Sequence, residues 1–80
     1  MMELAVVRWF DASRGYGFLD VDDRPAPVFV HFSAIVGNGW RDLAPGQRVR
    51  CEVAVTPRGP RATRVEAEGP PAQAGRGAAG

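Results

Sequence analysis

The chain has 80 residues, of which 45% are hydrophobic and 24% charged, and its formal net charge is +1. This length supports one small domain. The small net charge excludes binding that depends on bulk positive charge alone, because charge-driven nucleic-acid binders carry a larger basic excess. Cys51 is the only cysteine, so no intrachain disulfide can form. A chain without disulfides is typical of a reducing compartment, and we expect a cytoplasmic protein.

The first segments of the chain predict two β-strands. Residues 4–10 (LAVVRWF) are β-branched and aromatic, and residues 15–21 (GYGFLDV) follow a turn signal. Side chains of a strand alternate between its two faces, so Tyr16 and Phe18 point one way while Leu19 points the other. The N-terminus has no basic segment before an apolar run, and no run approaches 18 apolar residues. Neither a signal peptide nor a membrane span is therefore expected.

Residues 22–27 (DDRPAP) predict a loop, because they combine two prolines with adjacent acids. Residues 28–32 (VFVHF) predict a third strand. Alternation along this strand groups Phe29 and His31 on one face, opposite Phe32 and the two valines. The rings of the second and third strands thus fall on one side of the predicted sheet, and the aliphatic side chains fall on the other.

The second half of the chain predicts two more strands. After a helical turn and a glycine-punctuated loop over residues 33–46, residues 47–55 (QRVRCEVAV) alternate between apolar and polar. Residues 61–68 (RATRVEAE) fit an edge strand or, with Pro60 at the first helical position, a short helix. We favour the strand because the preceding strand needs a partner. The apolar face of the fourth strand would hold Val49, Cys51, Val53 and Val55.

Five short strands with aliphatic side chains on one face predict an all-β fold, a small five-stranded antiparallel barrel. Closing the barrel also removes exposed sheet edges. Residues 1–68 would form this domain. Residues 69–80 (GPPAQAGRGAAG) hold no large apolar side chain and would form a disordered tail. The predicted core comprises Leu19, Val21, Val28, Val30, Val49, Cys51, Val53 and Val65.

If the aliphatic face is the core, the rings of two adjacent strands stand outside. Cross-strand pairing would bring Tyr16, Phe18, Phe29 and His31 within reach of one another. A contiguous exposed aromatic patch indicates a docking surface. Rings set among arginines suit single-stranded nucleic acid, because bases stack on aromatic faces and guanidinium groups meet phosphates.

Two other interpretations remain open from the pattern alone. The aromatic face could be the buried one, although a chain of this length has no spare helix to cover the aliphatic face. The patch could instead bind a protein, since aromatic residues and arginine are favoured at such interfaces. An enzyme is not expected, because nothing supplies an oxyanion hole or a substrate cleft. With His31 as the only histidine, no histidine-based metal cluster can form.

The segments RWFDASRGYGFLDV, VFVHFSAI and PGQRVRCEV, in this order, resemble the cold-shock domain family. RGYGF is similar to the ribonucleoprotein-1 pattern and VFVHF to ribonucleoprotein-2, and the resemblance covers residues 2–68. It implies an OB-type barrel that binds single-stranded RNA and DNA as an RNA chaperone, affecting translation or transcription termination. The expected partners are these nucleic acids, with no cofactor, membrane or small-molecule substrate, and we expect a monomer.

Matched residue by residue, the resemblance implies a stacking surface flanked by basic contacts. Strict alternation from Val7 would turn Trp9 inward, whereas the family places this residue on the binding face, so a bulge is required near residues 8–10. Asp11 departs from the family's pattern and adds a negative charge near the site. Pro27 also departs from it and removes a carboxylate that could read a base edge. The implied nucleic-acid-binding residues are Arg8, Trp9, Arg14, Tyr16, Phe18, Phe29, His31, Phe32, Trp40 and Arg58.

Overall fold

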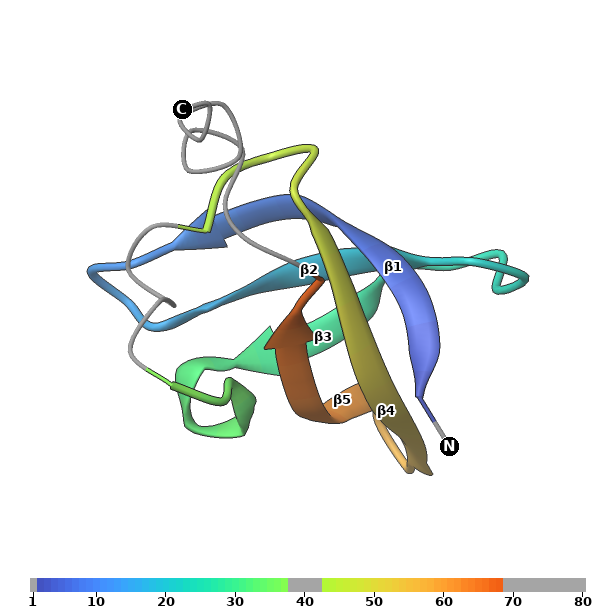
Figure 1. Cartoon of the computed structure of the whole chain (residues 1–80). Helices are drawn as coiled ribbons and strands as arrows, with labels where there is room; N and C mark the ends of the chain where they lie inside the picture. Colours follow the sequence, from blue (N-terminus) through green and yellow to red (C-terminus); the bar gives the residue numbers. More distant parts are fainter. Residues whose placement is uncertain (1, 38–42, 69–80) are drawn as a thin grey trace.

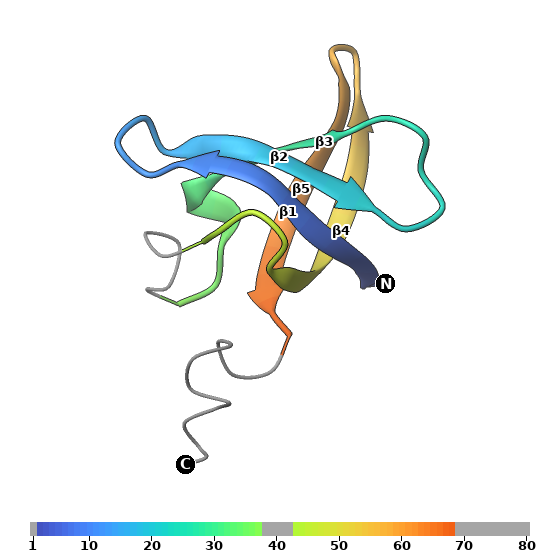
Figure 2. The same cartoon turned by 90° about the horizontal axis from the view of Figure 1, so that it is seen from above.

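The structure, a computed structural model, describes residues 2–37 and 43–68. Within this part of the chain, five strands close into a barrel in the order β1-β2-β3-β5-β4, which confirms the predicted all-β barrel (Figure 1, Figure 2). The predicted tail over residues 69–80 lies outside the described residues. The elements are β1 (Glu3–Asp11), β2 (Tyr16–Val21), β3 (Val28–His31), the 3-10 helix η1 (Phe32–Ala34), β4 (Arg48–Thr56) and β5 (Gly59–Ala67).

The strands pair antiparallel at four contacts of the barrel and parallel at the fifth. β1 pairs with β2 and β4, β2 pairs with β3, and β4 pairs with β5, all antiparallel. β3 meets β5 in parallel, where Phe29 lies opposite Arg61. The segment that fitted either a strand or a helix forms β5, which pairs with β4 along most of its length. The strand prediction is confirmed, because β5 is the element that completes the barrel between β3 and β4.

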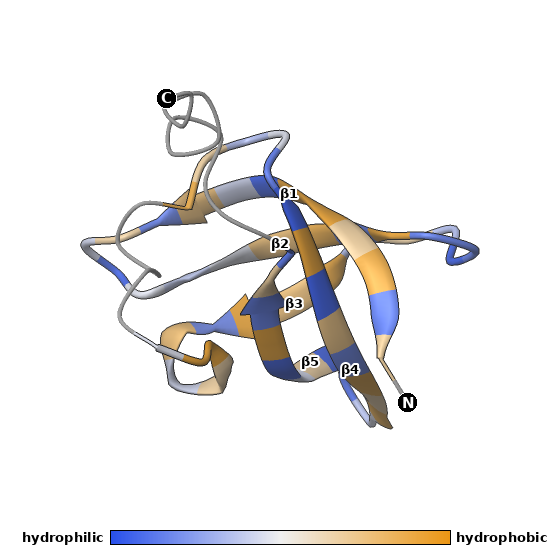
Figure 3. Ribbon diagram, viewed as in Figure 1, coloured by the Kyte–Doolittle hydropathy of each residue, from blue (hydrophilic) through white to orange (hydrophobic). Residues whose placement is uncertain are grey.

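Small aliphatic side chains fill the barrel. Seven of the eight predicted core residues are buried, and the eighth, Val53, is partly buried and packs against them. Ala5, Val7 and Ala62 complete the buried set. Figure 3 shows hydrophobic and hydrophilic bands alternating along β4 and β5, as expected for strands with one face on the core and one facing out.

The predicted alternation of the fourth strand is wrong at its C-terminal end. Alternation places Val55 on the core face, but its side chain is 80% exposed. The register of β4 against β5 shifts between Glu52 and Val53. Val53, directly after this shift, still packs against the core, so the shift does not reverse the faces of β4. Val55 is exposed because it pairs with Pro60 beside the hairpin turn, beyond the last buried residues of both strands.

Candidate nucleic-acid interface

The outer face of β2 and β3 carries four of the predicted aromatic residues. The two strands pair so that Tyr16 lies opposite His31 and Phe18 lies opposite Phe29. Leu19, the next residue along β2, is fully buried, so the rings point away from the core. The ring of Phe29 packs edge-on against that of Phe18, with centroids 5.8 Å apart, and stacks on that of Tyr16, with centroids 6.0 Å apart. The outward orientation predicted for these rings is confirmed.

Trp9 joins these rings through an irregularity in β1. The register of β1 against β2 shifts between Val7 and Trp9, which confirms the bulge expected near residues 8–10. Val7 is buried, whereas Trp9 is 39% exposed. The Trp9 ring centroid lies 5.9 Å from that of Tyr16 and 5.5 Å from that of Phe18. The bulge thus turns outward a side chain that strict alternation would bury.

Gly17 makes room for this bulge, at the point where β2 pairs with Phe10 of β1. A Cβ atom on Gly17 would lie 2.2 Å from the carbonyl oxygen of Trp9 and 2.7 Å from the Cα atom of Phe10. Both are backbone atoms, so neither can yield without displacing β1. The second glycine of RGYGF is therefore required by the close approach of the two strands.

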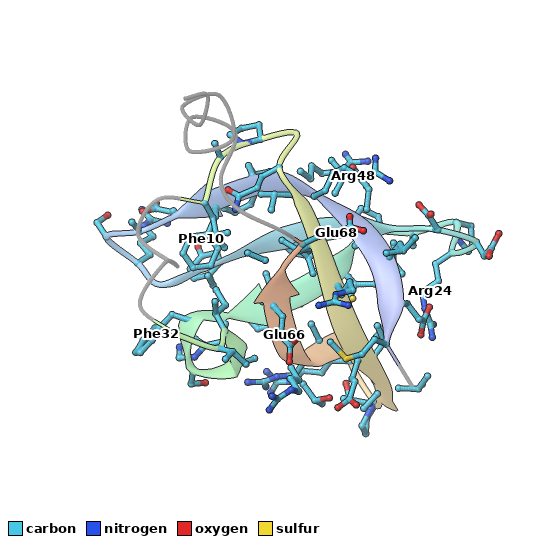
Figure 4. The ribbon with its side chains drawn as sticks, in the orientation of Figure 1. Phe10, Arg24, Phe32, Arg48, Glu66 and Glu68 are labelled. Atoms are coloured by element: carbon cyan, nitrogen blue, oxygen red, sulfur yellow. The ribbon has the colours of Figure 1, made fainter. Side chains whose placement is uncertain are left out.

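Phe32 lies outside, where the family resemblance places it, and not on the face that alternation predicts. Alternation groups it with the core valines, but β3 ends at His31, and Phe32 begins η1 at the edge of the barrel (Figure 4). Phe32 is 41% exposed, and its ring centroid lies 4.6 Å from that of His31. Gly15, with φ of 80°, lies beneath this ring, and a Cβ atom there would approach Cδ2 of Phe32 to 2.6 Å. The first glycine of RGYGF thus makes space for an outward-facing ring.

His31 is fixed by the start of η1. The backbone N–H of Ser33 donates to Nδ1 of His31 over 3.2 Å, and the Ser33 hydroxyl lies 2.8 Å from the same nitrogen. A neutral imidazole that accepts at Nδ1 carries its proton on Nε2, which leaves Nε2 as a hydrogen-bond donor. We call the resulting aromatic surface the ring face; it consists of Trp9, Tyr16, Phe18, Phe29, His31 and Phe32.

Two of the predicted basic contacts, Arg8 and Arg14, lie beside carboxylates. Nε of Arg8 is 3.0 Å from Oδ1 of Asp20. Nε of Arg14 is 3.8 Å from Oδ2 of Asp11, and Arg14 also donates to the Tyr16 hydroxyl over 3.3 Å. A phosphate would have to compete with these carboxylates for both guanidinium groups.

Asp11, the acidic departure noted in the sequence, caps the turn between β1 and β2. Its carboxylate accepts hydrogen bonds from the Ser13 hydroxyl at 2.8 Å, the Ser13 N–H at 3.0 Å and the Arg14 N–H at 3.1 Å. The hydrogen bond from the Ser13 hydroxyl is the largest cause that holds the pKa of Asp11 below its usual range, followed by that from the Arg14 N–H. The added negative charge is therefore engaged in the turn that leads into the ring face.

A hollow of about 410 Å³ lies where the β4–β5 hairpin approaches Phe18 and Phe29. Arg58 lines it, together with Arg61, which is not among the residues that the sequence singles out. The guanidinium carbon of Arg61 lies 5.5 Å from the Phe29 ring centroid. Arg61 reaches this ring because β3 and β5 are neighbours, and no local pattern signals that adjacency. The remaining lining residues are Pro27, Thr56, Gly59 and Pro60.

The profile of the 'Cold-shock' DNA-binding domain family matches residues 3–68. The chain belongs to the cold-shock domain family. Cold-shock domains bind nucleic acids, and the ring face lies within the matched segment. The major cold shock protein of Micrococcus luteus is 47% identical to this cold-shock domain over 64 residues, which cover 80% of this chain and 96% of that protein.

Two further comparisons extend this relationship in sequence and in fold. The cold shock-like protein CspE of Escherichia coli K12 is 49% identical over 59 residues, or 74% of this chain and 86% of that protein. Among solved structures, drosophila Unr CSD456 superposes with a TM-score of 0.73 at 23% identity. The superposition covers 88% of this chain and 28% of the Unr chain, so it shows a shared cold-shock domain fold.

Trp40 lies outside the described residues. Cys51 is fully buried, and burial is the main cause that raises the pKa of its thiol to about 11, so the thiolate is scarce at neutral pH.

Residues 2–37 and 43–68 hold no group of three or more histidine, cysteine or acidic side chains placed to bind a metal ion. The same residues contain no helix that is long and apolar enough to span a bilayer.

Proposed function

We propose that the ring face binds unpaired bases of single-stranded RNA or DNA by stacking, and that the protein acts through this binding as an RNA chaperone. The proposal rests on one observation. Four outward-facing rings, those of Trp9, Tyr16, Phe18 and Phe29, form an unbroken cluster with neighbouring centroids 5.5 to 6.0 Å apart. Unpaired bases gain stacking free energy on such a surface, because every base has a flat face that can stack on an aromatic ring.

The mechanism is passive. Stacking contributes about 1–3 kcal/mol per base, so three or four bases give useful affinity even though the net charge is +1. A base held on the ring face is withheld from pairing, so binding favours open strands over hairpins. The sequence carries no ATP-binding loop motif, and release therefore depends on modest affinity instead of on nucleotide hydrolysis.

Truncating single rings tests the proposal. Phe18→Ala and Phe29→Ala are each expected to weaken binding of a short pyrimidine-rich oligonucleotide by about 1–3 kcal/mol, because each removes one stacking partner. Calorimetric titration measures the affinity, and urea unfolding measures the stability of each variant. Val55→Ala serves as the matched control, since it shortens an apolar side chain that is 80% exposed and belongs to neither the ring face nor the hollow.

Two results would contradict the proposal. If the loss of affinity followed a loss of stability, the rings would act as core and not as a binding surface. If oligonucleotides failed to bind to the folded wild-type protein and left its tryptophan emission unchanged, the ring face would instead serve as the protein-interaction surface that the sequence pattern also allows.

A further inference from the structure

The arginines of residues 2–37 and 43–68 fall into two groups. Arg58 and Arg61 have no carboxylate within ion-pair distance in this part of the chain, and both line the hollow beside Phe18 and Phe29. A guanidinium without a carboxylate partner keeps its hydrogen-bond donors for a ligand. The hollow therefore combines two rings with two uncommitted cations. The arginines that do have carboxylate partners are Arg8, Arg14, Arg24, Arg48, Arg50 and Arg64.

The side chains that line the hollow offer donors and no free acceptor. Thr56 is the only lining side chain with a polar atom besides the two arginines. Its hydroxyl donates to the Gly59 carbonyl over 2.7 Å and accepts the Arg58 N–H at 3.1 Å, so it is committed to the hairpin turn. Pro27 also lines the hollow and contributes no polar side chain. A matching ligand must therefore present hydrogen-bond acceptors on its edge and an aromatic face to the rings.

We infer that Arg61 recognises guanine in this hollow, an inference that rests on the proposed function. Guanine presents two adjacent acceptors, O6 and N7, which a single guanidinium binds in bidentate fashion. Adenine offers N7 beside an amino donor, which would face the donors of the guanidinium. The structure thus assigns this cold-shock domain a base preference that stacking alone does not create.

Arg61, and not Arg58, is placed to contact the base. The Arg61 guanidinium carbon lies over the Phe29 ring, 5.5 Å from its centroid, so a base that stacks on this ring takes the place of the guanidinium and has its donors within reach of the base edge. Arg58 has no such ring contact among the described residues and lies in the exposed turn of the hairpin. It is therefore placed for the phosphate backbone, which carries no sequence information.

The experiment uses the full chain and a series of hexanucleotides. Each is hexathymidine carrying one guanine, one adenine or one 7-deazaguanine, and the substitution is scanned through all six positions. At one position we expect guanine to bind at least about fivefold tighter than adenine, which is the lower end of discrimination by a bidentate contact. The 7-deazaguanine oligomer lacks N7 and should lose this advantage. Arg61→Gln should abolish the preference for guanine while the variant still binds hexathymidine.

Two arginine variants serve as controls. Arg58→Gln removes the other uncommitted cation of the same hollow, and it should weaken the guanine and adenine oligomers by the same factor, as loss of a phosphate contact does. Arg64→Gln, on the same strand as Arg61 but 3.0 Å from Glu66, should leave the affinity for both oligomers unchanged.

Three results would overturn the inference. The first is equal affinity for the guanine and adenine oligomers at every position. The second is a preference for guanine that persists in Arg61→Gln. The third is an equal loss of affinity for all oligomers in Arg61→Gln, which would indicate that Arg61 contacts phosphate. In each of these cases hexathymidine still binds, so the proposed function stands. Failure of every oligomer to bind the folded wild-type protein would overturn both.

Discussion

Two outward-facing surfaces of this barrel, the ring face and the outer face of β4 and β5, meet the solvent in different ways. On the outer face of β4 and β5 away from the hollow, three arginines lie beside carboxylates: Arg48 lies 3.3 Å from Glu68, Arg50 lies 3.6 Å from Glu66, and Arg64 lies 3.0 Å from Glu66. Figure 4 labels Arg48, Glu66 and Glu68. The ring face instead exposes aromatic side chains, and the cations beside its hollow have no carboxylate partner among the residues that the structure describes. A ligand gains little binding free energy at a surface whose charges are already paired. It gains more at a surface with exposed rings and with hydrogen-bond donors that have no partner.

The largest expected effect concerns the backbone that supports the ring face. Gly17→Ala places a Cβ atom 2.2 Å from the carbonyl oxygen of Trp9, so β1 and β2 must separate. We expect a loss of about 3 kcal/mol in the free energy of unfolding, most of what a domain of this size is expected to have. Urea unfolding followed by circular dichroism measures it.

Gly46→Ala separates this steric effect from the general cost of replacing a glycine. Gly46 has φ of 89°, and a Cβ atom there would meet no other atom within 4 Å. Only the strain of the left-handed backbone conformation remains, which costs about 1–2 kcal/mol. A Gly17→Ala variant that is as stable as Gly46→Ala would contradict the close approach of β1 to β2 and the bulge that exposes Trp9.

The ring face also shows which features of the site follow from local pattern. The period of two places Tyr16 and Phe18 outside and Leu19 inside, because alternation is a property of any extended strand. At Val55 and Phe32 the pattern fails for local reasons that alternation itself does not describe. Val55 lies at the hairpin end of its strand, beyond the core, and Phe32 lies beyond the end of its strand.

Two other residues show what pattern alone could not supply. The exposure of Trp9 followed from the family resemblance, since strict alternation from Val7 predicts the opposite. Arg61 was missed because its position over Phe29 depends on the parallel contact of β3 with β5, which joins segments far apart in the sequence. Closure of the barrel can be predicted from five amphipathic strands, but the order of those strands depends on the whole fold.

The salt dependence of binding compares the two surfaces directly. If two or three phosphates meet Arg8, Arg14 and Arg58, the plot of log K against log salt concentration should have a slope of about −1.4 to −2. Arg58→Gln should make this slope shallower by about 0.7, the contribution of one phosphate on a single strand. Arg48→Gln, which removes a cation paired with Glu68 on the other surface, should leave it unchanged.

A slope near about −5 in the wild-type protein would indicate that charge, and not stacking, dominates the affinity. A change of slope in Arg48→Gln equal to that in Arg58→Gln would mean that the β4–β5 face also contacts the nucleic acid. Either result would remove the distinction between the two surfaces.

The smallest expected effect is the acid sensitivity of the turn that leads into the ring face. Hydrogen bonds from Ser13 and Arg14 lower the pKa of Asp11 in the folded protein below the unfolded value of 3.8. Folding then favours the ionised carboxylate, so this contribution to stability is complete above about pH 4 and is lost as the pH falls through the folded pKa. The stability of wild type relative to Asp11→Asn should therefore decrease between pH 7 and pH 3. Urea unfolding of both proteins at the two pH values measures this difference, and a constant difference would mean that the charge of Asp11 does not stabilise the turn.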